Sequence, residues 1–500
     1  MKQTQVIIIG AGPTGLALAC QLMRYNIDFL IIEKNKTTTP YSKAMVVHAR
    51  TLEIFKEYGL AKKAVESGQI VERFNITIEG THRGNIFLGK LGANLSEYPF
   101  VLALEQSKTE KLHVKYLAQK QKNILWESEM VSVNHTNKNV TITYKNKKGT
   151  LTKVQADYLV GCDGSHSMVR RSLNLPFLGD TLENTFYVAD AKIKSDLFNQ
   201  PEAYMNLVAN GFVLLFALEG KSHYRIIGVV PQEKQLSTYS FEDIEKIVHE
   251  QLDFSLIFEE KYWYATYKAH SRMVSTFSKG RCFLAGDAAH IHTPAGGQGM
   301  NTGIQDAYNL AWKLAFVLQK KAAPKLLDTY NLERTAVAKV LLKTTDRGFE
   351  VLTSNGFMAR YFKKYIFPLA AKLLTKTKIG GQNVFKRISQ TTITYSNSPL
   401  TIKSKIGRIV AGDRMPYFLV DGKSIYEQLK TPTFKILWFG TKNEVPLLNN
   451  NNLNITEVVI KEIPVFFKRK TDFYILLRPD NHISYIGKDV EKVVLLLSQL

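Results

Sequence analysis

The start of the chain changes its hydrophobic pattern twice within thirty residues. Residues 6–9 and 29–32 are short, continuous aliphatic runs of the kind that form strands buried on both faces of a sheet. Between them, residues 14–24 carry apolar side chains at helical spacing. The pattern predicts one strand–helix–strand unit over residues 4–33.

The rest of the chain reads as a second type of sheet followed by helices and a further α/β unit. Alternating runs between residues 180 and 275 predict an antiparallel sheet. Short helices are expected at residues 51–60, ending at the C-cap residue Gly59, and at 108–121. A long helix is expected to begin near Gly299, with helices continuing to about residue 390. Further strands are expected at residues 131–133, 140–144, 158–160, 212–218, 224–230, 262–268, 281–284, 434–439, 455–459 and 473–477.

A glycine-rich turn joins the first strand to the first helix. Gly10 allows the tight turn, Gly12 lets a pyrophosphate approach the backbone, and Gly15 lets helix and strand pack closely. The helix N-terminus adds a positive dipole. Glu33 ends the second strand, where an acid accepts hydrogen bonds from an adenosine ribose. We therefore prefer dinucleotide binding to a purely structural glycine turn.

Two further glycine–acid pairs follow buried apolar strands far downstream. One is Asp163-Gly164, and the other is Gly286-Asp287, which precedes the glycine-rich stretch 294–301. An acid at the end of a buried strand can reach a sugar hydroxyl, and a glycine-rich turn lets a flat ring lie against backbone N–H groups. Ordinary turns are the alternative for either pair alone. Their repetition after two strands favours a common nucleotide site.

These three elements together resemble the class A flavoprotein aromatic hydroxylases, the family of para-hydroxybenzoate and phenol hydroxylases. The resemblance is strongest to the polyketide, anthracycline and rifampicin monooxygenase branch, and it spans essentially the whole chain. It implies an α/β fold: a Rossmann-like FAD-binding domain with an inserted antiparallel-sheet substrate domain and a C-terminal thioredoxin-like domain. The expected domains are 1–80, 106–176 and 276–335 for FAD; 81–105 and 177–275 for substrate; 336–398 as a helical connector; and 399–500 as the thioredoxin-like domain. Since this last domain contains no cysteine, thiol redox chemistry is excluded there.

The resemblance also implies the residues of a non-covalent FAD site. The glycine turn would hold the pyrophosphate, Glu33 the adenosine ribose and Asp287 the ribityl chain. Asp163-Gly164 would serve both FAD and NAD(P)H. Arg225 resembles an arginine that helps the flavin move between positions, although an exposed strand arginine is an equal alternative. The candidate catalytic residues are Arg225 and Pro294, and the candidate cofactor-binding residues are Gly10, Gly12, Pro13, Thr14, Gly15, Glu33, Lys34, Lys43, Arg50, Gln106, Asp163, Gly164, Arg170, Gly286, Asp287, Pro294, Gly297, Gln298, Gly299, Met300 and Asn301.

Lys43 is a departure from the family pattern. The family usually has arginine at this place ahead of the Arg50 segment, and lysine keeps the charge but loses the planar fork that grips a phosphate. Lys43 is therefore expected either to contact the nicotinamide or flavin phosphates weakly or to be a solvated loop residue.

The implied activity is hydroxylation of an aromatic or polyketide-like small molecule with NADPH or NADH, molecular oxygen and a flavin C4a-hydroperoxide. The alternatives are a flavin oxidase or dehydrogenase of the same fold and a non-catalytic flavoprotein that holds a ligand. A flavin halogenase is disfavoured because the four tryptophans, Trp126, Trp263, Trp312 and Trp438, form no Trp-x-Trp segment. No general base is identified. His290 and His292 lack the neighbours of a metal site and are interpreted as packing residues.

Composition adds limits to this picture. Cys20, Cys162 and Cys282 are too far apart to suggest a disulfide framework or a zinc site, so we expect a cytoplasmic protein. We further expect a monomer or a homodimer. The sequence contains no run of about 18 apolar residues, so no transmembrane helix is predicted. No nucleic-acid partner is expected.

The net charge of +22 is concentrated in one region. Residues 318–390 contain 15 basic and 4 acidic residues, hence 15 − 4 = +11, together with many aromatic and aliphatic ones. One interpretation is an amphipathic basic surface that makes weak peripheral contact with anionic lipid or collects acidic substrate. The other, which the sequence alone favours, is a helical connector with a lysine-rich solvated face.

Overall fold

The computed structural model describes residues 2–40, 44–78, 81–89, 91–196, 202–208, 211–252, 254–354, 356, 358, 361–367, 369, 377–440, 453–469 and 471–500. Lys43 lies outside these residues, so its predicted phosphate contact stays a prediction.

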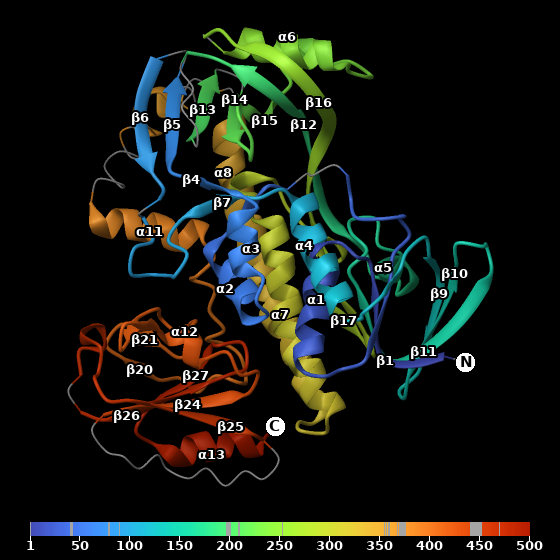
Figure 1. The fold of residues 1–500 in the computed structure, drawn as a ribbon, viewed down its shortest axis with the longest axis vertical. Coiled ribbons are helices and arrows are strands. Elements are labelled where there is room, and N and C mark those ends of the chain that lie inside the picture. Colours follow the sequence, from blue (N-terminus) through green and yellow to red (C-terminus); the bar gives the residue numbers. More distant parts are fainter. Residues whose placement is uncertain are drawn as a thin grey trace.

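An eight-stranded sheet forms the nucleotide-binding part of the molecule (Figure 1). Its parallel centre places β1 between β11 and β2, with β18 and β8 outside them. Its strands are β17 (Ser278–Lys279), β18 (Cys282–Leu284), β11 (Leu151–Gly161), β1 (Lys2–Ile9), β2 (Phe29–Ile32) and β8 (Ile124–Leu125), with β9 (Glu129–His135) and β10 (Val140–Lys145) as an antiparallel extension. The strand–helix–strand unit predicted for residues 4–33 is confirmed by β1, α1 (Pro13–Arg24) and β2. Because these strands are parallel, the segments that follow Ile9, Ile32, Gly161 and Leu284 all leave the same edge of the sheet.

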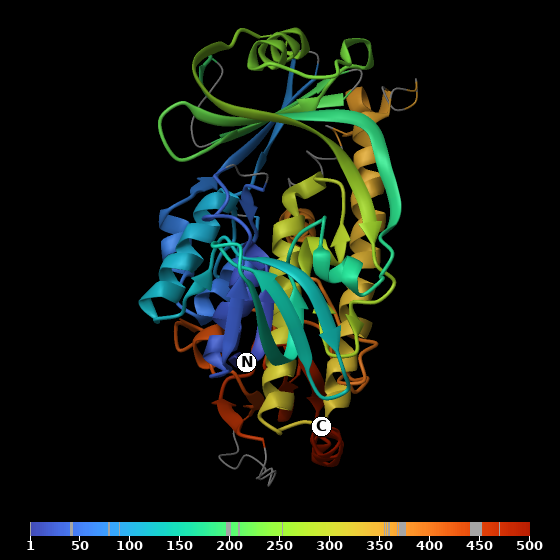
Figure 2. The same ribbon diagram turned by 90° about the vertical axis from the view of Figure 1, so that its right-hand side faces the viewer.

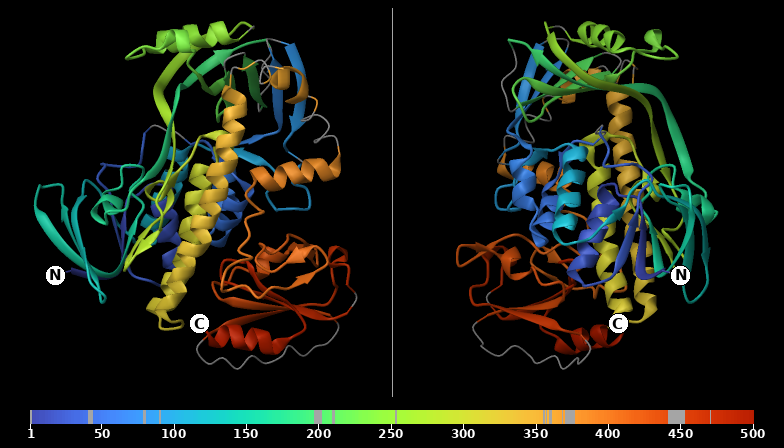
Figure 3. Two further views of the ribbon diagram at one scale, coloured as in Figure 1. Left: turned by 180° about the vertical axis from the view of Figure 1, so that it is seen from behind. Right: turned by 45° about the vertical axis from the view of Figure 1, so that its right-hand side comes forward.

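Helices cover this sheet and lead away from it. The 20-residue helix α7 packs against α1, and the 26-residue helix α8 runs beside α7 (Figures 1 and 3). The helices are α2 (Ala49–Glu57), α3 (Ala61–Glu66), α4 (Gln106–Gln119), α5 (Met168–Ser172), α6 (Phe241–Gln251), α7 (Gly299–Leu318), α8 (Asp328–Thr353), α11 (Lys378–Ile388), α12 (Ile425–Gln428) and α13 (Val490–Ser498). Within the described part of the chain, none of the helices is both long and apolar enough to cross a membrane.

A second eight-stranded sheet stands above the nucleotide-binding part. Its two longest strands, β12 (Leu178–Lys194) and β16 (Ile257–Met273), pair along almost their whole length and connect the two parts (Figure 2). The strand order is β19 (His290–Ile291), β16, β12, β15 (His223–Val229), β14 (Gly211–Ala217), β13 (Glu202–Val208), β5 (Arg73–Ile78) and β6 (Thr81–Phe87). A small three-stranded sheet has the order β3 (Val46–Val47), β7 (Val101–Ala103) and β4 (Gln69–Val71). Figure 1 shows β4 and β7 between the second sheet and the nucleotide-binding part.

The structure corrects one predicted domain boundary. A division at residue 80 would separate β5 from β6, yet these strands form a hairpin and β5 also pairs in parallel with β13. β5 is internal to the sheet because it pairs with β6 on one edge and with the distant strand β13 on the other, a position that no local pattern reveals. The substrate-side sheet therefore begins at Arg73.

The C-terminal region contains a four-stranded mixed sheet in the order β25 (Ile455–Ile460), β24 (Phe434–Phe439), β26 (Phe473–Leu477) and β27 (Ile483–Gly487). Only β24 and β25 are parallel, and α13 follows the last strand, which agrees with the thioredoxin-like topology expected from the sequence. Two short hairpins, β20–β21 (Lys405–Ile406, Ile409–Val410) and β22–β23 (Leu419–Val420, Lys423–Ser424), precede it. The region packs against α7, where Trp312 meets Phe434 edge-to-face.

Candidate functional site

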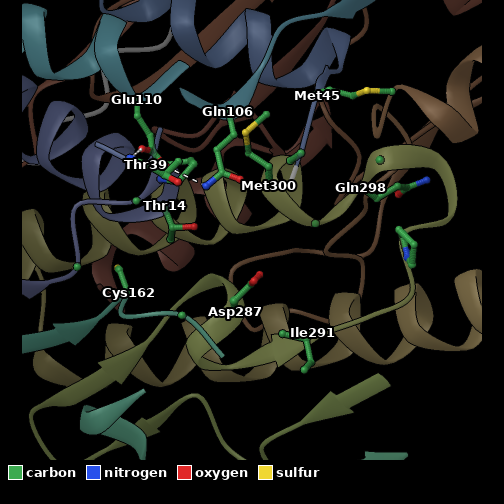
Figure 4. Close-up of a pocket in the computed structure, with 18 of the residues that line it drawn as sticks. Thr14, Thr39, Met45, Gln106, Glu110, Cys162, Asp287, Ile291, Gln298 and Met300 are labelled. Atoms are coloured by element: carbon green, nitrogen blue, oxygen red, sulfur yellow. Dashed lines mark hydrogen bonds between the residues drawn. The ribbon is translucent and has the colours of Figure 1, made fainter. Parts of the chain in front are cut away.

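A cavity of about 840 Å³ opens where the parallel strands end and extends under the second sheet. One end is lined by the glycine turn and the ends of the parallel strands. The other end is apolar and is formed by β5, β6, β13, β14, β15, β16 and α11. Figure 4 shows the middle of the cavity, where Thr14 and Gln106 lie on one side and Asp287 and Ile291 on the other.

The glycine turn is shaped by close backbone packing. Gly10 has a φ of +102°, and a Cβ on Gly15 would lie 2.0 Å from the carbonyl oxygen of Gly10. A Cβ on Gly12, in contrast, would meet no protein atom within 4 Å. Gly12 therefore faces open cavity at the N-terminus of α1, where backbone N–H groups and the helix dipole suit a diphosphate. The turn fits the pyrophosphate of a dinucleotide.

Glu33 binds the glycine turn as well as facing the cavity. Its Oε2 accepts a hydrogen bond from the backbone N–H of Ala11 at 2.7 Å, and Oε1 accepts two from Asn35 at 2.9 and 2.7 Å. Lys34 lies next to it on the cavity wall and is exposed. The carboxylate therefore fixes the turn and still lines the cavity.

Asp163 closes the end of β11. Its carboxylate accepts hydrogen bonds from the hydroxyl of Ser167 at 2.5 Å and from the N–H groups of Met168 and Val169 at 2.7 and 3.1 Å. Burial raises the pKa of Asp163, while these hydrogen bonds oppose the shift. Asp163 and Gly164 line the cavity, with the carboxylate anchored on the N-terminus of α5.

Gln106 is the first residue of α4 and reaches the cavity with a partner that sequence reasoning missed. Its side-chain amide donates to Glu110 at 2.9 Å, and Glu110 also accepts the N–H of Thr39 at 2.9 Å. Burial raises the pKa of Glu110. An acid one helical turn after Gln106 was the available signal.

The segment after β18 carries the opposite wall. Asp287 projects into the cavity from the one-turn helix η2 (Gly286–Ala288), as Figure 4 shows. Asp306 holds this turn by accepting the N–H of Gly286 at 3.0 Å and Nε2 of His290 at 2.9 Å. His290 stacks on Phe277, in agreement with its interpretation as a packing residue. Pro294, Gly297, Gln298, Gly299 and Met300 then line the wall up to the start of α7.

Three predicted site residues do not line the cavity and instead pack against the segments that do. Gly15 and Gly286 both lie against Thr14 or the turn beside it, and neither lines the cavity. Asn301 is fully buried and binds the backbone of Val46, Gly297 and His48. These residues hold the two walls at a fixed separation.

The three predicted arginines do not line the cavity among the described residues, and each is held by other parts of the protein. Arg50 is buried between α2 and the C-terminal region, where it donates to Glu53 and to the carbonyl of Asp480. Arg170 donates to the carbonyls of Ser165 and Ala288 and stacks on Phe177.

Arg225 is fully buried and forms a two-pronged ion pair with Asp190 at 2.7 and 2.6 Å. The pair joins adjacent strands, β15 and β12, and Trp263 donates to the same aspartate. Each of these arginines has a partner that lies far away in the sequence: Asp480 for Arg50, Ala288 for Arg170 and Asp190 for Arg225. The sequence could not show these long-range contacts.

The apolar end was missed by sequence reasoning. Strand alternation shows that side chains such as Leu214 and Phe216 share a face, but not which face meets a cavity. The apolar lining consists of Phe74, Ile86, Leu88, Val101, Met205, Leu214, Phe216, Ile227, Tyr267, Val384 and Ile388. The cationic lining residues, Lys34 and Arg171, lie at the nucleotide end instead. As far as the described residues show, the apolar end therefore suits an apolar ligand without a negative charge.

Two neutral histidines stand where the two ends meet. Burial lowers the pKa of both His48 and His292 to about 4. His48 Nε2 lies 3.1 Å from the carbonyl of Gly296, and His292 Nδ1 lies 2.6 Å from its neighbour's carbonyl. Each ring therefore stays uncharged at neutral pH and adds no charge to the cavity.

Comparison with known proteins agrees with this geometry. The model of the FAD binding domain family matches residues 3–345. The chain belongs to the class A FAD-dependent aromatic hydroxylases. This flavoprotein monooxygenase is 33% identical over 408 residues to the 6-methylpretetramide 4-monooxygenase of Streptomyces rimosus, covering 79% of this chain and 71% of that protein. It is 28% identical to a flavin-dependent monooxygenase of Mycobacteroides abscessus, with 99% of each chain covered.

Solved structures share the fold of this hydroxylase over its full length. The flavin-dependent monooxygenase PieE, solved with FAD and substrate, superposes with a TM-score of 0.83 at 19% identity, covering 100% of this chain and 99% of that chain. The anhydrotetracycline hydroxylase OxyS of Streptomyces rimosus superposes with a TM-score of 0.78 at 24% identity, covering 99% of both chains. The family assignment and the FAD cofactor are thereby confirmed.

Proposed function

We propose that this enzyme uses NADPH or NADH to hydroxylate an aromatic or polyketide-like small molecule through a flavin C4a-hydroperoxide. The observation that carries the proposal is one continuous cavity with a dinucleotide cradle at one end and, at the other, an apolar end, here termed the chamber, that no charged side chain lines among the described residues. Bound, reduced FAD supplies the activation of molecular oxygen. A flavin oxidase or dehydrogenase of the same fold would bind FAD and its substrate in the same cavity, so the fate of the oxygen distinguishes it from a monooxygenase.

Different parts of the cavity wall are proposed to bind different parts of FAD. The turn from Gly10 to Thr14 would bind the pyrophosphate, Glu33 and Lys34 the adenosine end, and Gln106 and Asp287 the ribityl chain. Asp163-Gly164 stays a proposed shared contact for FAD and NAD(P)H. The wall from Pro294 to Met300 would orient the ring system of the flavin toward the chamber, and Gln298 is held there by Gln390 at 3.0 Å.

The chamber side orients the substrate and excludes water. Its lining offers hydrocarbon and aromatic surface, which favours a ring system over a solvated ligand. Dry surroundings protect reactive oxygen species from hydrolysis and proton leakage. In this proposal the two large sheets correspond to the FAD-binding and substrate domains. The C-terminal region packs against α7. The enzyme is proposed to be a monomer or a homodimer.

The activity is tested by mixing the anaerobically reduced enzyme with oxygen and a panel of neutral phenols and polycyclic phenols. A product heavier by one oxygen atom, formed with NAD(P)H consumption, is expected. Acid precipitation should release the flavin into solution, since the FAD is proposed to be non-covalent. Reoxidation with stoichiometric hydrogen peroxide and no oxygenated product from any substrate would instead identify an oxidase, and retention of ligand without flavin turnover a holding protein.

Asp287→Ala is expected to weaken FAD binding about tenfold or more, and more than Glu33→Ala does. Asp287 is exposed in the cavity wall, where bound FAD would cover its carboxylate, and an unmade buried hydrogen bond costs about 1–3 kcal/mol. The Glu33 carboxylate already accepts three protein hydrogen bonds, so the ribose adds less there. FAD dissociation constants from flavin fluorescence titration of the apoproteins provide the comparison. The reverse order would show that Asp287 is misplaced in this assignment.

A further inference from the structure

The segment that follows α8 has its side chains arranged the opposite way to a normal solvent-facing helix. Its helical positions present large apolar side chains to solvent, with exposed fractions from 45% for Ile366 to 77% for Met358. Lys363, in the same segment, is 3% exposed and donates to the carbonyls of Leu352 and Ser354 at 3.2 and 3.0 Å. The exposed apolar side chains, here termed the apolar ridge, are Met358, Tyr361, Tyr365, Ile366 and Leu369.

This arrangement, in which apolar side chains are exposed and a lysine is buried, is stable only if the ridge has an apolar partner. A buried lysine costs side-chain entropy and desolvation, which here is offset by its hydrogen bonds to the C-terminal carbonyls of α8. Nothing comparable compensates for hydrating a ridge of five large apolar side chains. Contiguous apolar surface of this kind marks an interaction site.

Positive charge precedes the ridge in the chain. Lys339, Lys343 and Arg347 are exposed and spaced four residues apart, so they form one face of α8, here termed the basic stripe. The ridge begins five residues after α8 ends at Thr353. Both lie within residues 318–390, whose formal charge is +11. The partner of the ridge must therefore tolerate, or attract, many positive charges.

We propose that the apolar ridge and the basic stripe dock this enzyme onto an anionic lipid bilayer. Methionine, leucine and isoleucine side chains insert at the boundary between headgroups and acyl chains, tyrosines suit the headgroup level, and lysine and arginine attract anionic lipids. A second copy of this chain fits less well, because its own stripe and its net charge of +22 would repel this one.

The segment that carries the ridge packs against the hydrophobic cluster that borders the apolar chamber. Phe367, on the inner side of the ridge segment, belongs to the same hydrophobic cluster as the chamber residues Met205 and Tyr267. Val384 and Ile388 of α11 line the chamber itself. Membrane docking therefore presents the chamber to lipophilic substrates dissolved in the bilayer. This consequence rests on the proposed function, whereas the docking itself does not.

The test is flotation of the FAD-loaded enzyme with vesicles of phosphatidylcholine, with and without phosphatidylglycerol, at low and high salt. The wild type is expected to bind anionic vesicles at least tenfold more tightly than neutral ones, and more weakly at high salt. A ridge variant and a stripe variant should each lose at least tenfold in binding. These variants are Met358→Ser/Tyr361→Ser/Leu369→Ser and Lys339→Glu/Lys343→Glu/Arg347→Glu.

Matched controls change the same chemistry elsewhere. Val494→Ser/Leu495→Ser removes exposed apolar side chains from α13, and Lys138→Glu/Lys145→Glu/Lys148→Glu reverses three exposed charges near the β9–β10 hairpin. Both controls should bind vesicles like the wild type, and all variants should retain FAD and the wild-type melting temperature. Equal binding to neutral and anionic vesicles, or ridge and stripe variants that bind like the wild type, would overturn the proposal. Loss of a homodimer in the ridge variant without any loss of vesicle binding would assign the ridge to a second copy instead.

Discussion

Gly12→Ala is expected to lower FAD affinity by at least tenfold while leaving the stability of the apoprotein unchanged. The φ of Gly12 is −73° and a Cβ there meets no protein atom within 4 Å, so alanine is compatible with the fold. The added methyl group would instead occupy cavity next to the N–H groups of α1, where the pyrophosphate is proposed to lie. Thermal melting of the apoprotein and FAD titration separate the two quantities.

Gly15→Ala serves as the contrasting variant in the same turn. Its Cβ would lie 2.0 Å from the carbonyl oxygen of Gly10, a backbone atom that cannot rotate away, so α1 must shift relative to β1. Overpacking of this kind typically costs about 1–3 kcal/mol. Both the melting temperature and FAD retention should fall. An unchanged FAD affinity in Gly12→Ala would show that the pyrophosphate does not pass this glycine.

Glu333→Ala is expected to lower the free energy of unfolding by about 3–5 kcal/mol, the usual cost of removing one partner of a buried ion pair. Both oxygens of Glu333 bind the guanidinium of Arg478, at 2.6 and 2.9 Å, and one also accepts Nζ of Lys313 at 2.7 Å. All three side chains are fully buried or nearly so. The substitution takes this anion from Lys313, while Arg478 keeps its second carboxylate partner, Asp480, at 2.5 Å.

The pH dependence follows from the same contacts. Arg478 and Lys313 oppose the effect of burial and lower the pKa of Glu333 from 4.5 to about 2. A depressed folded-state pKa means that the contribution is present above pH 4.5 and is lost as the pH falls toward 2. The stability difference between wild type and Glu333→Gln, measured by urea unfolding, should therefore shrink between pH 5 and about pH 3. Glu350→Ala, on the exposed face of the same helix, is the control and should change little. A loss below about 1 kcal/mol in Glu333→Ala would show that the network is dispensable.

The sequence by itself determined the parts of the site that consist of consecutive residues. The turn from Gly10 to Gly15 with Glu33, and the segment from Asp287 to Met300, were predicted to bind the cofactor, and the structure places them in the cavity wall or directly behind it. Their conformation depends on local backbone geometry. A tight turn, a close approach and a helix start each require particular residue types within a few positions. The same local logic predicted β1, α1, β2 and the start of α7.

Only the tertiary structure decided which side chains face the chamber and which form hydrogen bonds between distant parts of the fold. Arg50 and Arg225 matched family positions, yet Asp480 and Asp190 hold them away from the cavity wall. Strand periodicity places Leu214 and Phe216 on one face but does not say what that face meets, and the pairing of β5 with β13 joins residues more than a hundred positions apart. Such partners are chosen by long-range packing and charge burial, which depend on the whole fold and leave no signature in neighbouring residues.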